Sequence, residues 1–283
     1  MEKQPLRELI GKHVLGVLGT YQQGSDKMDV YICGVEIPDE THLKLNFPKG
    51  HTLNRGQLVT LHLDNRTGVS EYDAELSVYR LSYKANVRSV INQNEVVLDA
   101  LEYQVFYGIS AVKTYMADDY QFPKDVRQTK SLPLTPLVDA PCIDEEEHDN
   151  KIGVLLTYAS QQPHTTVMAF LSSVDDDIFF ITFPSTFKGL LLQRDNRCYF
   201  AIDSRALFTF EHAIEWNYSI IQGPVYHIPK DSAVFAQVRE LFITKNPWEM
   251  GFFSHPDIEM YHLKAEHVVW PKIAPPALQT NIV

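Results

Sequence analysis

The chain has 283 residues, of which 45% are hydrophobic and 22% charged, so it can bury one large core or two ordinary ones. Its net charge is −11 and its Lys and Arg residues form no clustered stripe, which argues against general nucleic-acid binding because phosphate neutralisation needs such clusters. The three cysteines lie far apart and form no Cys-x-x-Cys pair, which argues against a disulfide framework or a zinc site.

The first residues of the chain, 1–21, carry charges too early and too often for a signal peptide. No stretch approaches the roughly 20 apolar residues of a membrane span, so we expect a cytoplasmic protein without a membrane partner. Residues 1–130 are rich in short runs of β-branched and aromatic residues separated by turn residues, which is typical of strands. We predict that 1–130 form a β-barrel-like domain without a ligand.

Residues 131–150 interrupt this pattern. Pro133, Pro136 and Pro141 oppose regular structure, and an acidic run follows them from Asp144. The segment is predicted to be a linker between two domains. A proline-rich surface loop inside a single domain is the alternative.

Residues 151–271 again read as strands and are predicted to form a second domain, with 272–283 as a tail. In one segment, residues 231–244, the spacing of apolar residues changes from that of a strand to that of a helix, which predicts a helix with one apolar face. Asp231 or Ser232 is its expected N-cap, and Pro247 lies beyond its end. The predicted strands are 152–159, 165–172, 178–183, 197–203, 206–213, 216–227 and 258–269.

The two halves resemble each other in sequence. Residues 16–21 (GVLGTY) match residues 153–158 (GVLLTY) at five of six positions. Further matches follow in the same order. They are Phe47-Pro48 with Phe183-Pro184, Leu53 and Arg55 with Leu192 and Arg194, and Asp64 and Arg66 with Asp203 and Arg205. Two copies of one unit predict a duplicated or structurally analogous pair of barrels.

A hydroxyl-rich turn follows the aromatic strand that ends at Thr182. Ser185 and Thr186 lie in this turn, and Lys188 lies in or near the first turn of the next helix. Hydroxyls and N–H groups at a helix start can donate to an anion, and one ammonium supplies the opposing charge. The segment therefore suits a phosphate ester, although the same residues also fit a strand end and an exposed helix lysine.

With these motifs in this order, residues 150–270 resemble the FMN-binding split-barrel proteins related to pyridoxamine 5'-phosphate oxidase. In that family a strand ending in Thr leads to a Ser/Thr turn, a Lys and a Leu-containing helix; residues 163–170 resemble the strand whose backbone lines the flavin ring. The resemblance implies a mainly β fold of tandem split-barrel-like halves with peripheral helices, FMN in the C-terminal half, and a homodimer. The cofactor-binding residues that it implies are Thr166, Val167, Met168, Ile181, Thr182, Ser185, Thr186 and Lys188.

Two departures limit the activity that this resemblance implies. Phe187 stands where phosphate-binding members often carry Arg, and no segment resembles the Arg-Leu-His-x-Arg substrate clamp of the true oxidases. We therefore predict an FMN-dependent oxidoreductase acting on another small molecule, with no substrate or electron donor indicated. No local signature marks a catalytic residue, and no histidine spacing predicts a metal site.

Two other functions fit the same sequence. The first is a non-enzymatic binding or regulatory protein that has kept the barrel and lost the cofactor. The second is a haem-binding relative of the fold, with His255, His262 or His267 as a candidate axial ligand. Residues 1–130 also weakly resemble the barrel that precedes cyclic-di-GMP-binding domains in flagellar brake proteins, but no Arg-x-x-x-Arg motif accompanies it.

Overall fold

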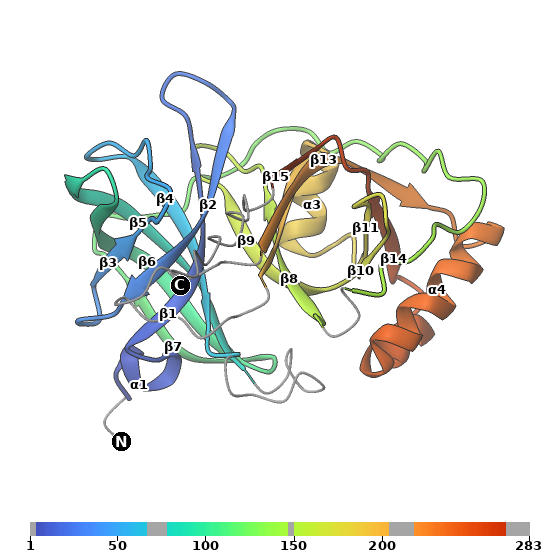
Figure 1. Ribbon diagram of the computed structural model, residues 1–283, viewed down its shortest axis with the longest axis horizontal. Coiled ribbons are helices and arrows are strands. Elements are labelled where there is room, and N and C mark those ends of the chain that lie inside the picture. The colour runs from blue at the N-terminus through green and yellow to red at the C-terminus, as the bar shows by residue number, and fades with distance from the viewer. Residues whose placement is uncertain (1–3, 67–77, 147–149, 204–217, 270–283) are drawn as a thin grey trace, which may run out of the picture.

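The computed structural model describes residues 4–66, 78–146, 150–203 and 218–269. Its strands form two sheets that lie side by side, with the first half of the chain in one and the second half in the other (Figure 1). This confirms the predicted mainly β fold with tandem split-barrel-like halves. No helix within these ranges is both long and apolar enough to cross a membrane.

The first sheet closes into a barrel. Its strands follow the order β3-β2-β1-β4-β5-β6-β7, and pairing of β3 with β6 joins the two sides. Inward-facing apolar side chains fill the interior, with the stacked rings of Tyr83 and Tyr103 among them. The elements are α1 (Leu6–Ile10), β1 (His13–Tyr21), β2 (Met28–Glu36), β3 (His42–Asn46), β4 (Leu58–Asp64), β5 (Tyr79–Asn92), β6 (Glu95–Tyr107) and β7 (Ser110–Met116).

The second sheet repeats much of this topology. Its strands follow the order β10-β11-β14-β13-β12-β8-β9, and β15 pairs with β13. Pairing of β8 with β12 and of β11 with β14 corresponds to that of β1 with β4 and β3 with β6. The strands are β8 (Ile152–Thr157), β9 (His164–Ala169), β10 (Leu171–Ser172), β11 (Ile178–Thr182), β12 (Arg197–Asp203), β13 (Tyr218–Ile228), β14 (Glu259–Leu263) and β15 (His267–Val269).

In the described part of the second half, three helices accompany the sheet: α3 (Phe187–Arg194), α4 (Ala233–Lys245) and the 3-10 helix η2 (Pro247–Ser254). The predicted helix over 231–244 is α4, and Ser232 caps it by accepting a hydrogen bond from the Phe235 N–H at 3.1 Å. The predicted strand over 206–213 and the predicted tail over 272–283 lie outside the described residues.

The proline-rich segment runs along the second sheet after crossing over from the first (Figure 1). The Thr135 N–H donates to the His227 carbonyl at 2.9 Å, and the His227 N–H donates to the Pro133 carbonyl at 2.8 Å. Leu137 and Ile143 pack against the apolar cluster beneath α4. The prolines exclude regular structure here, but the segment is nevertheless attached to the second half by these contacts.

The two halves pack against each other through the repeated sequence. Val17 from β1 and Val154 from β8 belong to one apolar cluster that joins the halves. Gly19 and Leu156 occupy the one position at which the repeats differ, and a Cβ atom on Gly19 would lie 2.7 Å from Leu156 Cδ2. The Tyr21 hydroxyl completes the contact by donating to the Ala159 carbonyl at 2.7 Å.

Candidate functional site

A pocket with a volume of about 510 Å³ lies between the two halves, and we call it the interbarrel pocket. Its lining combines strands β4, β5 and β6 of the first half with β9 and the start of α3 in the second. The residues are His62, Arg80, Leu81, Ser82, Lys84, Glu102, Gln104, Phe106, Phe122, His164, Thr165, Thr166, Val167, Thr186, Phe187 and Lys188.

Four of the eight predicted cofactor-binding residues line this pocket. Thr166 and Val167 come from β9, Thr186 precedes α3, and Lys188 lies in the first turn of α3. Residues that the resemblance grouped from two separate segments thus meet at one place.

The other four predicted residues lie outside the lining. Met168 is buried in the core of the second half, and Ile181 is buried beneath α4. Thr182 is buried behind the turn, with its Oγ1 atom 3.3 Å from Thr186 Oγ1, whereas Ser185 is exposed. Thr182 therefore supports the turn from behind and does not face the pocket.

The start of α3 is fixed by its own side chains. Thr186 is the N-cap: its hydroxyl accepts from the Gly189 N–H at 3.3 Å and donates to the Phe183 carbonyl at 2.7 Å. A Cβ atom on Gly189 would come within 2.7 Å of the carbonyl oxygens of Phe183 and Pro184. Only glycine allows the turn to approach the helix this closely, and this approach sets the direction in which Lys188 enters the pocket.

The wall contributed by the first half carries a buried lysine. Lys84 on β5 is only 6% exposed, and its Nζ atom donates to Ser82 Oγ at 2.7 Å. The Ser82 hydroxyl in turn lies 2.9 Å from Thr165 Oγ1 on β9, so this contact spans the two halves. Burial lowers the pKa of the Lys84 ammonium to about 8, against a smaller opposing effect of Glu102.

The pKa of His164 is influenced by the positive charges inside the pocket. Burial lowers the pKa of its imidazole well below the usual value, and the nearby ammonium groups of Lys84 and Lys188 lower it further. A neutral His164 therefore lies beside two cations, with Arg80 also in the lining and Glu102 as its single acidic residue. In a chain with a net charge of −11, this pocket therefore has a local excess of positive charge, which favours anions.

Replacing Lys84 with Met should stabilise the ligand-free protein. Below a pH of about 8 the Lys84 ammonium is charged in the folded and in the unfolded protein, and burying this charge lowers the free energy of unfolding. The effect decreases as the pH rises from about 8 to about 10.5, above which the lysine is neutral in both the folded and the unfolded protein. We expect Lys84→Met to raise the free energy of unfolding by about 1–3 kcal/mol at neutral pH and by almost nothing above pH of about 10.5. Urea denaturation of both proteins at the two pH values measures this, and equal stability at neutral pH would contradict it.

The candidate haem ligands do not meet in the structure. His262 is fully buried, with its Nδ1 atom 2.8 Å from Thr135 Oγ1 and its Nε2 atom 2.9 Å from Asp177 Oδ2, so both ring nitrogens are occupied. His255 directly follows η2 and is exposed, and His267 lies on β15; neither lines the interbarrel pocket. Within the described ranges no cluster of His, Cys, Asp and Glu side chains could hold a metal ion.

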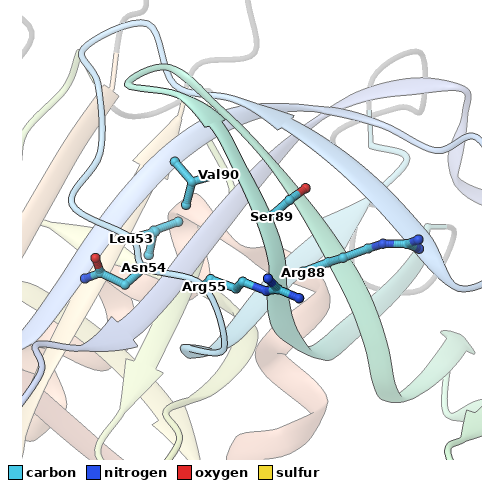
Figure 2. A pocket seen from close by; sticks show the side chains of 6 residues that line it. All are labelled: Leu53, Asn54, Arg55, Arg88, Ser89 and Val90. Atoms are coloured by element: carbon cyan, nitrogen blue, oxygen red, sulfur yellow. The ribbon is translucent and has the colours of Figure 1, made fainter.

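A second hollow, of about 640 Å³, lies on the first half alone and contains none of the predicted residues. Figure 2 shows Arg55, from the loop before β4, and Arg88, from β5, beside it. Arg88 pairs with Asp99 at 3.4 Å, and the hairpin residue Val90 is exposed. Despite its larger volume, this hollow has neither the buried cation nor the second wall of the interbarrel pocket.

The contribution of the first half could not be recognised from local sequence. Lys84 and Ser82 occupy alternate positions of β5 whose side chains point out of their own barrel, and such positions are usually solvated. Phe122 lies in an irregular segment after β7 without a motif. These residues become part of a site because the second half covers them.

Comparison with known proteins finds solved structures that are similar to part of this chain. No family model and no curated protein matches the sequence. Similar solved structures include the heme storage protein HutZ from Vibrio cholerae (14% identity, 44% of this chain and 90% of that chain, TM-score 0.37). They also include a heme binding protein from Mycobacterium smegmatis (15% identity, 43% of this chain and about half, 48%, of that chain, TM-score 0.38).

A third is a putative pyridoxamine 5'-phosphate oxidase from Listeria innocua (16% identity, 42% of this chain and 87% of that chain, TM-score 0.34). Each of these matches spans less than half of the present chain. One of these structures thus bears the name of the family that residues 150–270 resemble in sequence.

Proposed function

We propose that the chain binds FMN in the interbarrel pocket and uses it as an oxidoreductase. The observation that carries the proposal is that Lys188 and Thr186, the predicted phosphate-binding pair, open onto this pocket together with Thr166 and Val167. A volume of about 510 Å³ lies within the range of small-molecule sites.

The residues present fit such a ligand in charge and polarity. Lys188 and the start of α3 would hold the phosphate, because ammonium groups and helix N-termini both favour anions. The rings of Phe106 and Phe122 and the side chain of Val167 offer apolar surface for a flat ring system. A bound flavin would supply the redox chemistry, and the protein would bind it, orient it and limit the access of water.

FMN should bind more tightly than riboflavin, because the proposed contacts grip the phosphate. One charge-assisted hydrogen bond is worth about 1.5–3 kcal/mol, so a preference of about ten- to hundredfold is expected. Fluorescence titration of the dialysed protein with each flavin measures it. Equal affinities would contradict the proposal, and uptake of haemin in place of FMN would favour the haem-binding alternative.

A second measurement separates an enzyme from a carrier. Protein loaded with FMN should oxidise a reduced nicotinamide or pass electrons from a chemical reductant to an acceptor faster than free FMN does. FMN binding without any such turnover would instead favour the non-enzymatic alternative. The homodimer and the cytoplasmic location stay predictions; the described lining of the interbarrel pocket comes from both halves of one chain.

A further inference from the structure

Lys84 is a buried cation that faces the second half of the chain. Its Nζ atom lies 5.0 Å from the centre of the Phe122 ring, and Phe122 packs edge-on against Phe187 with ring centres 5.9 Å apart. Phe187 directly precedes Lys188, so this row of contacts leads from β5 to the first turn of α3. Lys84 in the wall of the first half is thus connected to the start of α3 through two aromatic rings that line the same pocket.

The surroundings of Lys84 leave its charge poorly compensated. The hydrogen-bond partner of its Nζ atom is the neutral hydroxyl of Ser82, and no ion pair joins it to a carboxylate in the described part of the chain. Burying a charge is costly, and Glu102, which lies opposite Lys84 on β6, offsets only part of that cost. A second cation, Lys188, acts on the same imidazole of His164 as Lys84 does, so the two ammonium groups share one region of the pocket.

We infer that Lys84 is a second phosphate-binding residue, so that a phosphate monoester dianion is held between one lysine from each half. The identity of the ligand as FMN rests on the proposed function, whereas the anion-binding role of Lys84 rests on the contacts above. Two cations match the charge of a phosphate monoester, which is close to −2 at neutral pH. The first half then takes part in binding, contrary to the prediction that residues 1–130 form a domain without a ligand.

Because Lys84 titrates near the physiological range, its role makes binding depend on pH. The charged and titratable groups that face it in the pocket are Glu102 on β6, His62 on β4, Arg80 on β5, His164 on β9 and Lys188 on α3. Above a pH of about 8 the amine must take up a proton to bind a dianion, so affinity should fall by up to about tenfold per pH unit. An arginine at this position stays charged and should remove that dependence.

Binding of FMN and riboflavin to the wild type, Lys84→Met and Lys84→Arg tests the inference, with Lys49→Met as a matched control because Lys49 lies outside the pocket. Lys84→Met should weaken FMN binding about ten- to hundredfold and leave riboflavin binding unchanged. Lys84→Arg should keep FMN affinity at neutral pH and lose its decline above pH of about 8. Unchanged FMN affinity in Lys84→Met would overturn the inference while the proposed function stands.

A probe without a flavin separates the two proposals further. Inorganic phosphate should raise the melting temperature of the wild type above that in chloride of equal ionic strength, and this increment should vanish in Lys84→Met. Each protein serves as its own baseline, so the stabilising effect of the substitution does not interfere. Stabilisation by phosphate in a wild type that does not prefer FMN would refute only the flavin proposal. An equal increment in both proteins would refute the role of Lys84.

Discussion

Replacing Lys188 with Ala is expected to weaken FMN binding by one to two orders of magnitude while the fold stays intact. Lys188 is half-buried in the first turn of α3, and its substitution removes a charge-assisted contact worth about 1.5–3 kcal/mol. Because Phe187 places no charge beside it on α3, Lys188 is the cation through which the second half would hold the phosphate. Quenching of flavin fluorescence measures the change.

Two further substitutions serve as comparisons for Lys188→Ala. Thr186→Ala should cost about 1 kcal/mol of stability because Thr186 is the N-cap of α3. It should weaken FMN binding less than Lys188→Ala does, because the single hydroxyl proton of Thr186 is donated to the Phe183 carbonyl. Lys49→Ala should leave FMN affinity unchanged, since Lys49 lies over the Tyr218 ring outside the pocket. Wild-type affinity in Lys188→Ala would place the phosphate site elsewhere and remove the main residue-level support for the function.

Replacing Asp177 with Ala should lower the free energy of unfolding by about 3 kcal/mol. The buried carboxylate accepts from the His262 ring and from the Ala265 N–H, both at 2.9 Å, and from Lys264 Nζ at 3.2 Å. Its loss leaves the fully buried His262 with an unpaired nitrogen, and breaking such a buried pair is strongly destabilising. The melting temperature should fall by about 6–12 °C in calorimetry.

Asp175 provides the matched control, because it belongs to the same turn and is exposed. Asp175→Ala should change stability by less than about 0.5 kcal/mol. Burial alone would raise the pKa of Asp177, but hydrogen bonds from His262 and Ala265 hold it below its usual value. The stability that Asp177 provides is therefore present above a pH of about 3.9 and is lost as the pH falls through its lower folded value. Equal melting temperatures for both variants would show that the buried cluster is dispensable.

Local patterns were sufficient to predict most elements of the second half. The strand predicted over 197–203 is β12 with the same bounds, and the single predicted strand over 165–172 is divided between β9 and β10 at Phe170. Burial on both faces explains why the division was not visible, since a continuous apolar run does not show where pairing changes. The motifs around Thr182 correctly indicated where α3 begins.

Features that depend on distant contacts were not predictable. A run of three aspartates at 175–177 is typical of a turn, and nothing in it distinguishes Asp177, which is buried against His262, from the exposed Asp175. Lys84 likewise carries no signal of burial, because the covering surface comes from β9 and α3 in the second half. The family resemblance gave candidate residues from the second half alone, whereas both halves line the pocket. Which residues of the two halves face each other is determined only when the chain folds.

At the contact between Gly19 and Leu156, the first half provides the small residue and the second half the large one. Gly19 and Leu156 are equivalent positions of the repeat, and they contact each other between the halves. If two copies of the second half packed through this surface, two leucine side chains would have to occupy the same space. Two first halves would leave a gap beside a pair of glycines, and only the mixed arrangement sets a large residue against a small one. This pair therefore favours packing of a first half against a second half over packing of two identical halves. Both walls of the interbarrel pocket come from one chain, so neither needs a second chain to supply it.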